Sequence, residues 1–124
     1  MRRAVLNVVG LSARDLSSGE MPQIAAFAKR GSFSKIIPAF PAVTCTAQSD
    51  YLTGERPVVH GIVGNGWYDR ALSEVHFWKQ SNRLVHAPKV WDKLHQRSSR
   101  LRIANLFWWY NMGTRADISV TPRP

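Results

Sequence analysis

The residues best suited to chemistry lie between Phe40 and Asn65, in the stretch FPAVTCTAQSDYLTGERPVVHGIVGN. Thr44 stands where a Pro-bounded loop passes into a run that predicts a helix as far as Gly54. The first turn of a helix exposes free backbone N–H groups and the positive end of the helix dipole. A hydroxyl at that place is therefore well placed to meet an anion.

Two other roles compete for this position. A threonine at the start of a helix is more often an N-cap than a nucleophile, because its oxygen accepts a hydrogen bond from the first turn. Cys45 is a rival nucleophile beside Thr44, although a single cysteine is most often a small buried apolar residue. One cysteine allows no intrachain disulfide, so nothing indicates an oxidising compartment.

The pattern PAVTxxxxxxxLTGxxPxxHGIVGN resembles the nucleophile segment of the nucleotide pyrophosphatase/phosphodiesterase family, the type I phosphodiesterases of the alkaline phosphatase superfamily. In that family a threonine after the proline is the covalent nucleophile and a zinc ligand, and its position falls on Thr44. The family's asparagine after the HGI turn holds a phosphoryl oxygen, and that position falls on Asn65.

The resemblance implies a metal-dependent hydrolase of phosphodiester or pyrophosphate bonds, with two Zn²⁺ ions as cofactors. A threonine hydroxyl is a poor nucleophile until metal coordination deprotonates it. The N–H₂ group of Asn65 would donate to the oxygen on which charge builds during phosphoryl transfer. The expected substrate is a small phosphodiester or a nucleotide.

The sequence departs from the family at one metal position. The family's first strand ends in an Asp-Gly pair whose aspartate binds metal, whereas Val9 precedes Gly10 here. The other zinc ligands of the family lie in Asp-His-Gly-type motifs beyond the matching region. We therefore expect this chain by itself to be inactive, and the remainder of the domain or another chain to complete the site.

Around this segment, apolar runs and turn residues predict alternating strands and helices. Open α/β sheets place ligands at the carboxyl ends of their strands, which is where the Thr44 loop would fall. The expected elements are strands at 4–9, 32–37, 102–109 and 118–120, helices at 21–31, 44–54 and 88–96, and a loop or helical turn at 11–20.

Aromatic and polar residues alternate over 66–70 and 74–79, which predicts a β-hairpin. The resemblance implies aromatic contacts near the nucleotide, and Trp67 and Tyr68 are the candidates because they follow Asn65 closely. Cross-strand packing is the favoured interpretation for both. His60 belongs to the HGI turn and is expected to be structural, whereas His76, His86 and His95 lack metal-ligand spacing.

The composition is that of one globular domain, with 44% hydrophobic and 20% charged residues. The net charge of +9 is spread along the chain, so a nucleic-acid-binding module is a less favoured hypothesis than an enzyme. No apolar run approaches the ~20 residues that span a bilayer, and the N-terminus does not read as a signal peptide, so a cytoplasmic protein without membrane contact is expected.

These observations predict an α/β fold: part of a doubly wound, mostly parallel sheet with flanking helices and a β-hairpin insertion, as in alkaline phosphatase. Residues 1–124 are expected to form the N-terminal part of one such phosphodiesterase domain. A second hypothesis, motivated by Val9, is a non-catalytic domain that binds phosphate or nucleotide without metals.

Overall fold

The computed structural model describes residues 3–122. Contacts within the chain divide it into two compact units, one that runs up to Ile37 and one that begins at Pro38. The segment from Thr44 to Asn65 lies entirely in the second unit. Each unit is described by itself below.

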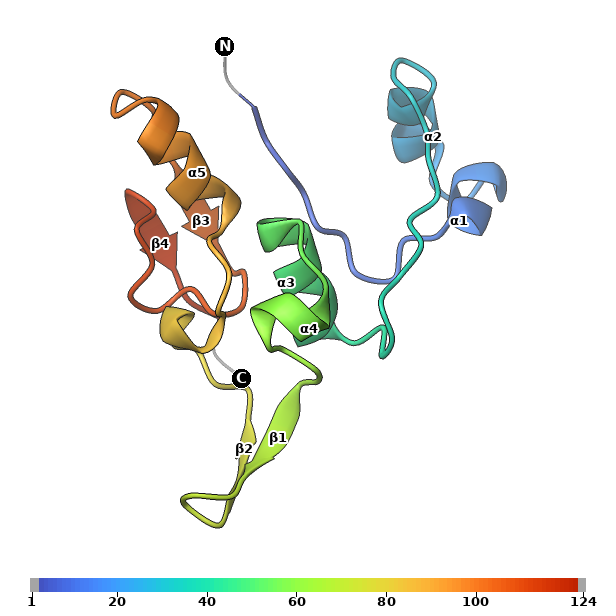
Figure 1. Cartoon of the computed structure of the whole chain (residues 1–124). Helices are drawn as coiled ribbons and strands as arrows, with labels where there is room; N and C mark the ends of the chain where they lie inside the picture. The colour runs from blue at the N-terminus through green and yellow to red at the C-terminus, as the bar shows by residue number, and fades with distance from the viewer. Residues whose placement is uncertain (1–2, 123–124) are drawn as a thin grey trace. The chain divides into compact units, whose positions relative to one another are not determined.

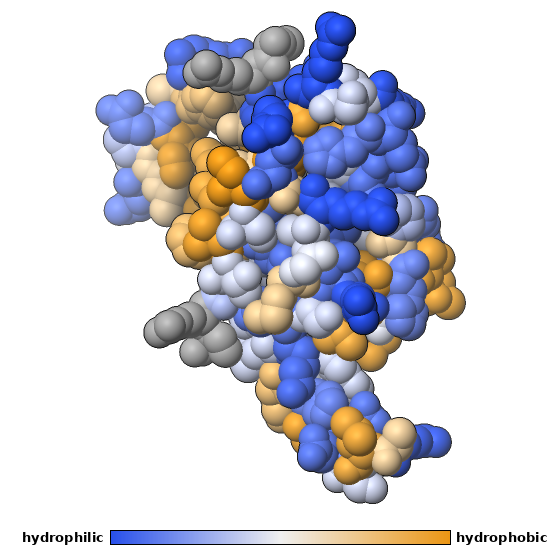
Figure 2. Space-filling model, turned by 90° about the vertical axis from the view of Figure 1, so that its left-hand side faces the viewer, coloured by the Kyte–Doolittle hydropathy of each residue, from blue (hydrophilic) through white to orange (hydrophobic). Residues whose placement is uncertain are grey.

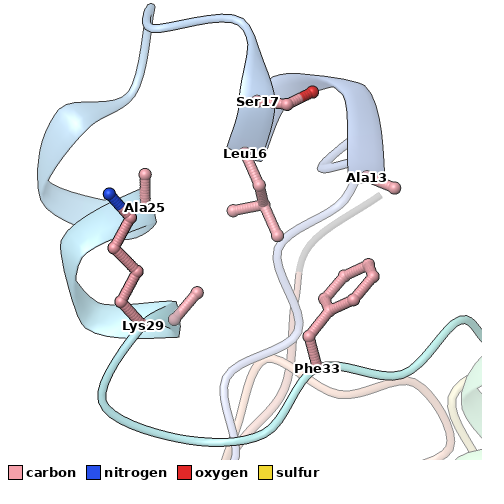
Figure 3. Close-up of a pocket in the computed structure, with 7 residues that line it drawn as sticks. Ala13, Leu16, Ser17, Ala25, Lys29 and Phe33 are labelled. Carbon is pink, nitrogen blue, oxygen red and sulfur yellow. The ribbon is translucent and has the colours of Figure 1, made fainter.

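The first unit contains the short helices α1 (Ala13–Ser17) and α2 (Pro22–Ala28) (Figure 1). Pro22 occupies the first turn of α2, where its missing N–H costs nothing. An open hollow of about 330 Å³ lies between the two helices, and the side chains of Leu16 and Phe33 line it with the stem of Lys29 (Figure 3). The predicted helix at 21–31 is confirmed in its central part, and the predicted helical turn at 11–20 is confirmed as α1.

The strands predicted at 4–9 and 32–37 are wrong for this structure, because neither segment forms a strand. Leu6 is 84% exposed and Ile37 is 94% exposed. A strand is defined by its ladder of hydrogen bonds to a neighbour, and no partner strand for either segment lies in the described part of the chain. Their apolar residues therefore remain uncovered in this structure.

The second unit carries four helical segments and four short strands (Figure 1). In chain order they are α3 (Thr44–Thr53), α4 (Pro57–His60), β1 (Gly66–Asp69), β2 (Glu74–Phe77), the 3₁₀ helix η1 (Asn82–Leu84), α5 (Val90–Arg97), β3 (Ala104–Leu106) and β4 (Ile118–Val120). The helices predicted at 44–54 and 88–96 are confirmed as α3 and α5.

Strands β1 and β2 form the predicted antiparallel hairpin, in which Trp67 lies opposite His76 and Tyr68 lies opposite Val75. Strands β3 and β4 pair in parallel, with Ala104 opposite Ile118. The class is therefore mixed α/β, as expected, while the parallel part of the sheet consists of two strands among the described residues.

The core of the second unit forms around Cys45, Ile62, Val85 and Tyr110, with Trp78, Leu84 and Trp109 packed against it. These residues come from α3, from the segment after α4, from η1 and from the loops that follow β2, η1 and β3. The core thus lies directly beneath the start of α3. None of the described helices is long and apolar enough to cross a membrane.

Candidate functional site

Thr44 is the first residue of α3 and is half-buried. The N-cap residue is Val43, which has extended backbone angles and makes no side-chain cap. The first hydrogen bond of the helix joins the Ala47 N–H to the Val43 carbonyl at 2.9 Å. The N-cap interpretation of Thr44 is therefore wrong, because the hydroxyl lies one residue inside the helix.

Asn65 supplies the cap that Val43 cannot. Its Oδ1 accepts a hydrogen bond from the Cys45 N–H at 2.9 Å, although the two residues are twenty positions apart. A backbone N–H can donate only to an acceptor, so this contact assigns the oxygen of the amide to the helix and leaves its N–H₂ group for another partner. The structure thus brings Asn65 to the residue next to Thr44.

His60, the last residue of α4, holds the turn that leads to Asn65. It is fully buried, and its Nε2 lies 2.7 Å from Asp50 Oδ1 on α3. Its Nδ1 accepts a hydrogen bond from the Ile62 N–H at 3.0 Å, which leaves the ring proton on Nε2 to be donated to Asp50. The expectation that His60 is structural is confirmed.

Helix α3 buries an unusually polar face, which includes Thr46, Gln48, Ser49 and Thr53. Gln48 Oε1 accepts from the Trp109 N–H at 2.8 Å, and the Ser49 hydroxyl donates to the Cys45 carbonyl at 2.8 Å. Gln48 is not among the site residues that the sequence predicts. Its tie to Trp109 gave no local signal, because the two residues are far apart in the chain.

Cys45 is fully buried, and burial raises the pKa of its thiol. Burial likewise raises the pKa of the Tyr110 hydroxyl, and the neighbouring Cys45 adds to that effect. A thiol that is both shielded and protonated is a poor nucleophile. The structure therefore favours the expectation that Cys45 is a small core residue.

The aromatic candidates lie on the hairpin. Trp67 packs edge-on against His76, with ring centroids 5.6 Å apart, which agrees with the cross-strand alternative. Tyr68 is 58% exposed. Trp78, which is not among the predicted site residues, also contacts this segment. Its backbone N–H donates to the Asn65 carbonyl at 3.1 Å, and its ring centroid lies 4.8 Å from that of Trp109.

The donor set does not fit the zinc pair implied by the resemblance. Among residues 3–122, no group of three or more His, Cys, Asp or Glu side chains is arranged to hold a metal ion. Thr44 is the one expected ligand in the second unit, and Val9 stands where the family has an aspartate. The described residues alone cannot form a two-metal centre.

Thr44 is thus the first residue of α3, the Asn65 carboxamide meets the residue after it, and the N–H groups and dipole of a helix start favour an anion. A family model described as type I phosphodiesterase / nucleotide pyrophosphatase matches residues 4–124. The chain belongs to this family of hydrolases.

A similar protein of known sequence is an uncharacterized pyrophosphatase/phosphodiesterase of Schizosaccharomyces pombe, strain 972, which is 30% identical over 90 residues. The matched region is 72% of this chain and 18% of the yeast protein, so the chain spans about a fifth of the length of this relative.

Proposed function

We propose that this chain is the nucleophile-bearing part of a metal-dependent hydrolase of phosphodiester or pyrophosphate bonds, and that Thr44 is the nucleophile. The observation that carries the proposal is the 2.9 Å hydrogen bond from the Cys45 N–H to Asn65 Oδ1. It places a carboxamide beside the first residue of α3. The family match supports the same class of reaction.

In the proposed reaction, the Thr44 oxygen attacks phosphorus and forms a new O–P bond while the bond to the leaving oxygen breaks. The Thr44 proton passes to solvent or to the leaving group, and water later breaks the Thr44 O–P bond of the intermediate, releasing the phosphoryl group with any ester group that it still carries. Asn65 Nδ2 donates to a non-bridging oxygen as its negative charge grows. The N-terminal dipole of α3 favours the same charge.

Residues outside the described part would complete the site, either from the remainder of the domain or from another chain. The two Zn²⁺ ions remain part of the proposal on the strength of the family resemblance, with Thr44 as the ligand that this chain would supply. Trp67 and Tyr68 remain the proposed aromatic contacts of the substrate. The β3–β4 pair would belong to a wider, doubly wound, mostly parallel sheet.

Val9 supports a second candidate function, a domain that binds phosphate without metals and without turnover. In that case the cap at Asn65 and the helix dipole would provide all the affinity. The two candidates make opposite predictions: the hydrolase needs both zinc and the Thr44 hydroxyl for turnover, whereas the binding domain needs neither for phosphate binding.

The test is hydrolysis of bis(4-nitrophenyl) phosphate with added Zn²⁺, by this chain and by a form extended through the downstream reading frame. Thr44→Val and Thr46→Val are matched, because both replace a hydroxyl with a methyl group on neighbouring threonines. We expect Thr44→Val to lower kcat of the extended form by about a thousandfold or more, as expected for loss of a nucleophile. Thr46→Val should be neutral, since the buried Thr46 hydroxyl has no hydrogen-bond partner in the described part of the chain.

Asn65→Asp distinguishes the role of the Asn65 oxygen, which caps α3, from the role of its nitrogen, the proposed donor to the phosphoryl oxygen. The aspartate oxygen can still accept from the Cys45 N–H, whereas the N–H₂ group is replaced by a negative oxygen. We expect the melting temperature to be retained and kcat to fall by about a hundredfold or more.

Full activity of Thr44→Val would rule out the proposed nucleophile. An extended form that is inert but binds inorganic phosphate without zinc would favour the second candidate.

A further inference from the structure

We propose that Asp50 and His60 act as a positioning pair, which holds the Asn65 carboxamide in register with the first turn of α3. The inference rests on the proposed function, because it assigns the pair a role in presenting Asn65 to the phosphoryl group. Neither residue would touch the substrate.

The segment from His60 to Asn65 is hydrogen-bonded to α3 at two positions along the helix, one at each end of the segment. His60 Nε2 lies 2.7 Å from Asp50 Oδ1 in the second half of α3, and the Cys45 N–H in the first turn donates to Asn65 at 2.9 Å. Asp50 lies roughly 9 Å further along the helix axis than Thr44. The pair therefore acts at a distance from the reacting atoms, through the segment 60–65 that connects the two hydrogen bonds.

Both ring nitrogens and the backbone carbonyl of His60 take part in hydrogen bonds. Its ring contacts Asp50 through one nitrogen and the Ile62 N–H through the other, while its carbonyl accepts from the His86 N–H at 3.1 Å. The side chain is fully buried, so water cannot replace these partners. A ring fixed at both nitrogens cannot rotate without breaking buried hydrogen bonds, each of which is costly to leave unmade.

The start of the turn that follows is constrained by its neighbours. Gly61 has a φ of 80°, and a Cβ at that position would lie 3.1 Å from His86 Nδ1. Ile62 is buried in the same core as Cys45. The path from His60 to Asn65 thus has little freedom, and a shift at the Asp50 contact would be passed on to the Asn65 amide.

The test measures amide hydrogen exchange in the 124-residue chain by NMR, and takes the ratio of protection at Cys45 to protection at Ala47. Both amides lie in the first turns of α3, but Cys45 donates to Asn65 whereas Ala47 donates to Val43 within the helix. General loosening of α3 would lower both. Displacement of Asn65 would lower the Cys45 value alone.

We expect Asp50→Ala to reduce the ratio by about tenfold, the effect of one lost hydrogen bond. Asp50→Asn should preserve it, because the amide oxygen can still accept from His60 Nε2. The control is Leu94→Ala on α5, which removes half-buried apolar packing from another helix and should leave the ratio unchanged. If Asp50→Ala fails to fold, Asp50→Leu, of similar size and without an acceptor, takes its place.

An unchanged ratio in Asp50→Ala, or an equal change in Leu94→Ala, would overturn the positioning role. Titration with inorganic phosphate then tests the connection to the site, and Asp50→Ala should weaken binding about tenfold in parallel with the ratio. A changed ratio with undiminished phosphate affinity would also overturn it. A changed ratio in the 124-residue chain, together with an extended form that binds no phosphate with or without Zn²⁺, would support the positioning of Asn65 and contradict the proposed function.

Discussion

At the scale of single residues, the Asn65 carboxamide has one observed role in the fold and, in the proposed function, a second role in binding. Its oxygen satisfies a backbone N–H at the start of α3, which would otherwise be one of the unpaired donors of the first turn. Its nitrogen faces the other way and is a donor. A residue with both an acceptor and a donor is needed here, and this explains why Asp or Ser could supply the cap without the same oxyanion contact.

Lys89 is a buried residue outside the site with a measurable electrostatic effect. It is 1% exposed, its ammonium group donates to Asn82 Oδ1, and it lies 5.9 Å from the centroid of the Trp91 ring. Burial lowers the pKa of Lys89 to about 8, and the nearby Asp92 carboxylate partly offsets that effect. Folding therefore disfavours the charged form of this side chain.

This predicts a pH-dependent stability. Between about pH 8 and the ordinary lysine pKa of 10.5, the unfolded chain binds more protons at Lys89 than the folded chain does, so the free energy of unfolding should rise with pH. The slope from this group is at most about 1.4 kcal/mol per pH unit. The measurement is urea unfolding at several pH values.

Lys89→Met is the control, since it keeps the length of the side chain and removes the titration. Cys45 and Tyr110 act in the opposite direction at high pH, because their raised pKa values favour folding only while they stay protonated. The difference between wild type and Lys89→Met isolates the lysine. Parallel pH profiles for the two proteins would show that Lys89 does not titrate as described.

At the scale of secondary-structure elements, α3 is held more by hydrogen bonds than by an apolar face. Gln48 joins it to the Trp109 loop, Asp50 joins it to His60, and Cys45 joins it to Asn65. Such directional contacts define a helix position more narrowly than apolar packing, which tolerates small shifts. In the proposed function, this arrangement would fix the position of the Thr44 hydroxyl.

The β1–β2 hairpin depends on close approach at Gly66. A Cβ at this position would lie 2.5 Å from Phe77 Cδ1 and 2.6 Å from the His76 carbonyl oxygen. Because one of these atoms belongs to the backbone, the clash cannot be relieved by a rotamer change. Gly66→Ala should destabilise the hairpin by about 1–3 kcal/mol, the usual cost of overpacking.

The measurement is the set of cross-strand NOEs between Trp67 and His76, which Gly66→Ala should weaken or abolish. Ala71→Gly, in the exposed turn of the same hairpin, is the comparison and should preserve these NOEs. Intact cross-strand contacts in Gly66→Ala would contradict the predicted steric conflict.

At the scale of the whole molecule, the second unit leaves much apolar surface uncovered. Leu106, Ile118 and Val120 of the parallel pair are exposed, although parallel strands are normally covered on both faces. Exposed apolar side chains also lie between polar ones on the hairpin at the lower end of the molecule (Figure 2). Open strand edges and apolar patches favour association.

We therefore expect the isolated chain to self-associate with increasing concentration, as measured by sedimentation velocity. Ile118→Lys should reduce association, because a charge on the parallel pair would be costly to bury. Val58→Lys is the matched control on α4, where the valine is 90% exposed and lies away from the strands in the sequence. A monodisperse monomer over the whole concentration range would count against the view that this chain lacks part of its sheet.

Local signals in the sequence were sufficient for most elements of the second unit. Gly54 marked the end of α3, where it has a φ of 71°, and the aromatic-polar alternation predicted the hairpin. The resemblance singled out Thr44 and Asn65 as site residues. The predictions of elements succeed because they depend on neighbours within a few residues, whereas the roles of Thr44 and Asn65 stay predictions.

Tertiary structure decided the rest. Apolar runs at 4–9 and 32–37 predicted strands, but a strand also needs a partner, and the sequence of the run does not contain that information. The same holds for the contacts of Gln48 with Trp109 and of Asp50 with His60. The sequence by itself determined which residues match the family's motif, Thr44 and Asn65 among them. Only the folded chain decided how the Asn65 amide meets α3, because a hydrogen bond across twenty residues depends on the path of the backbone between them.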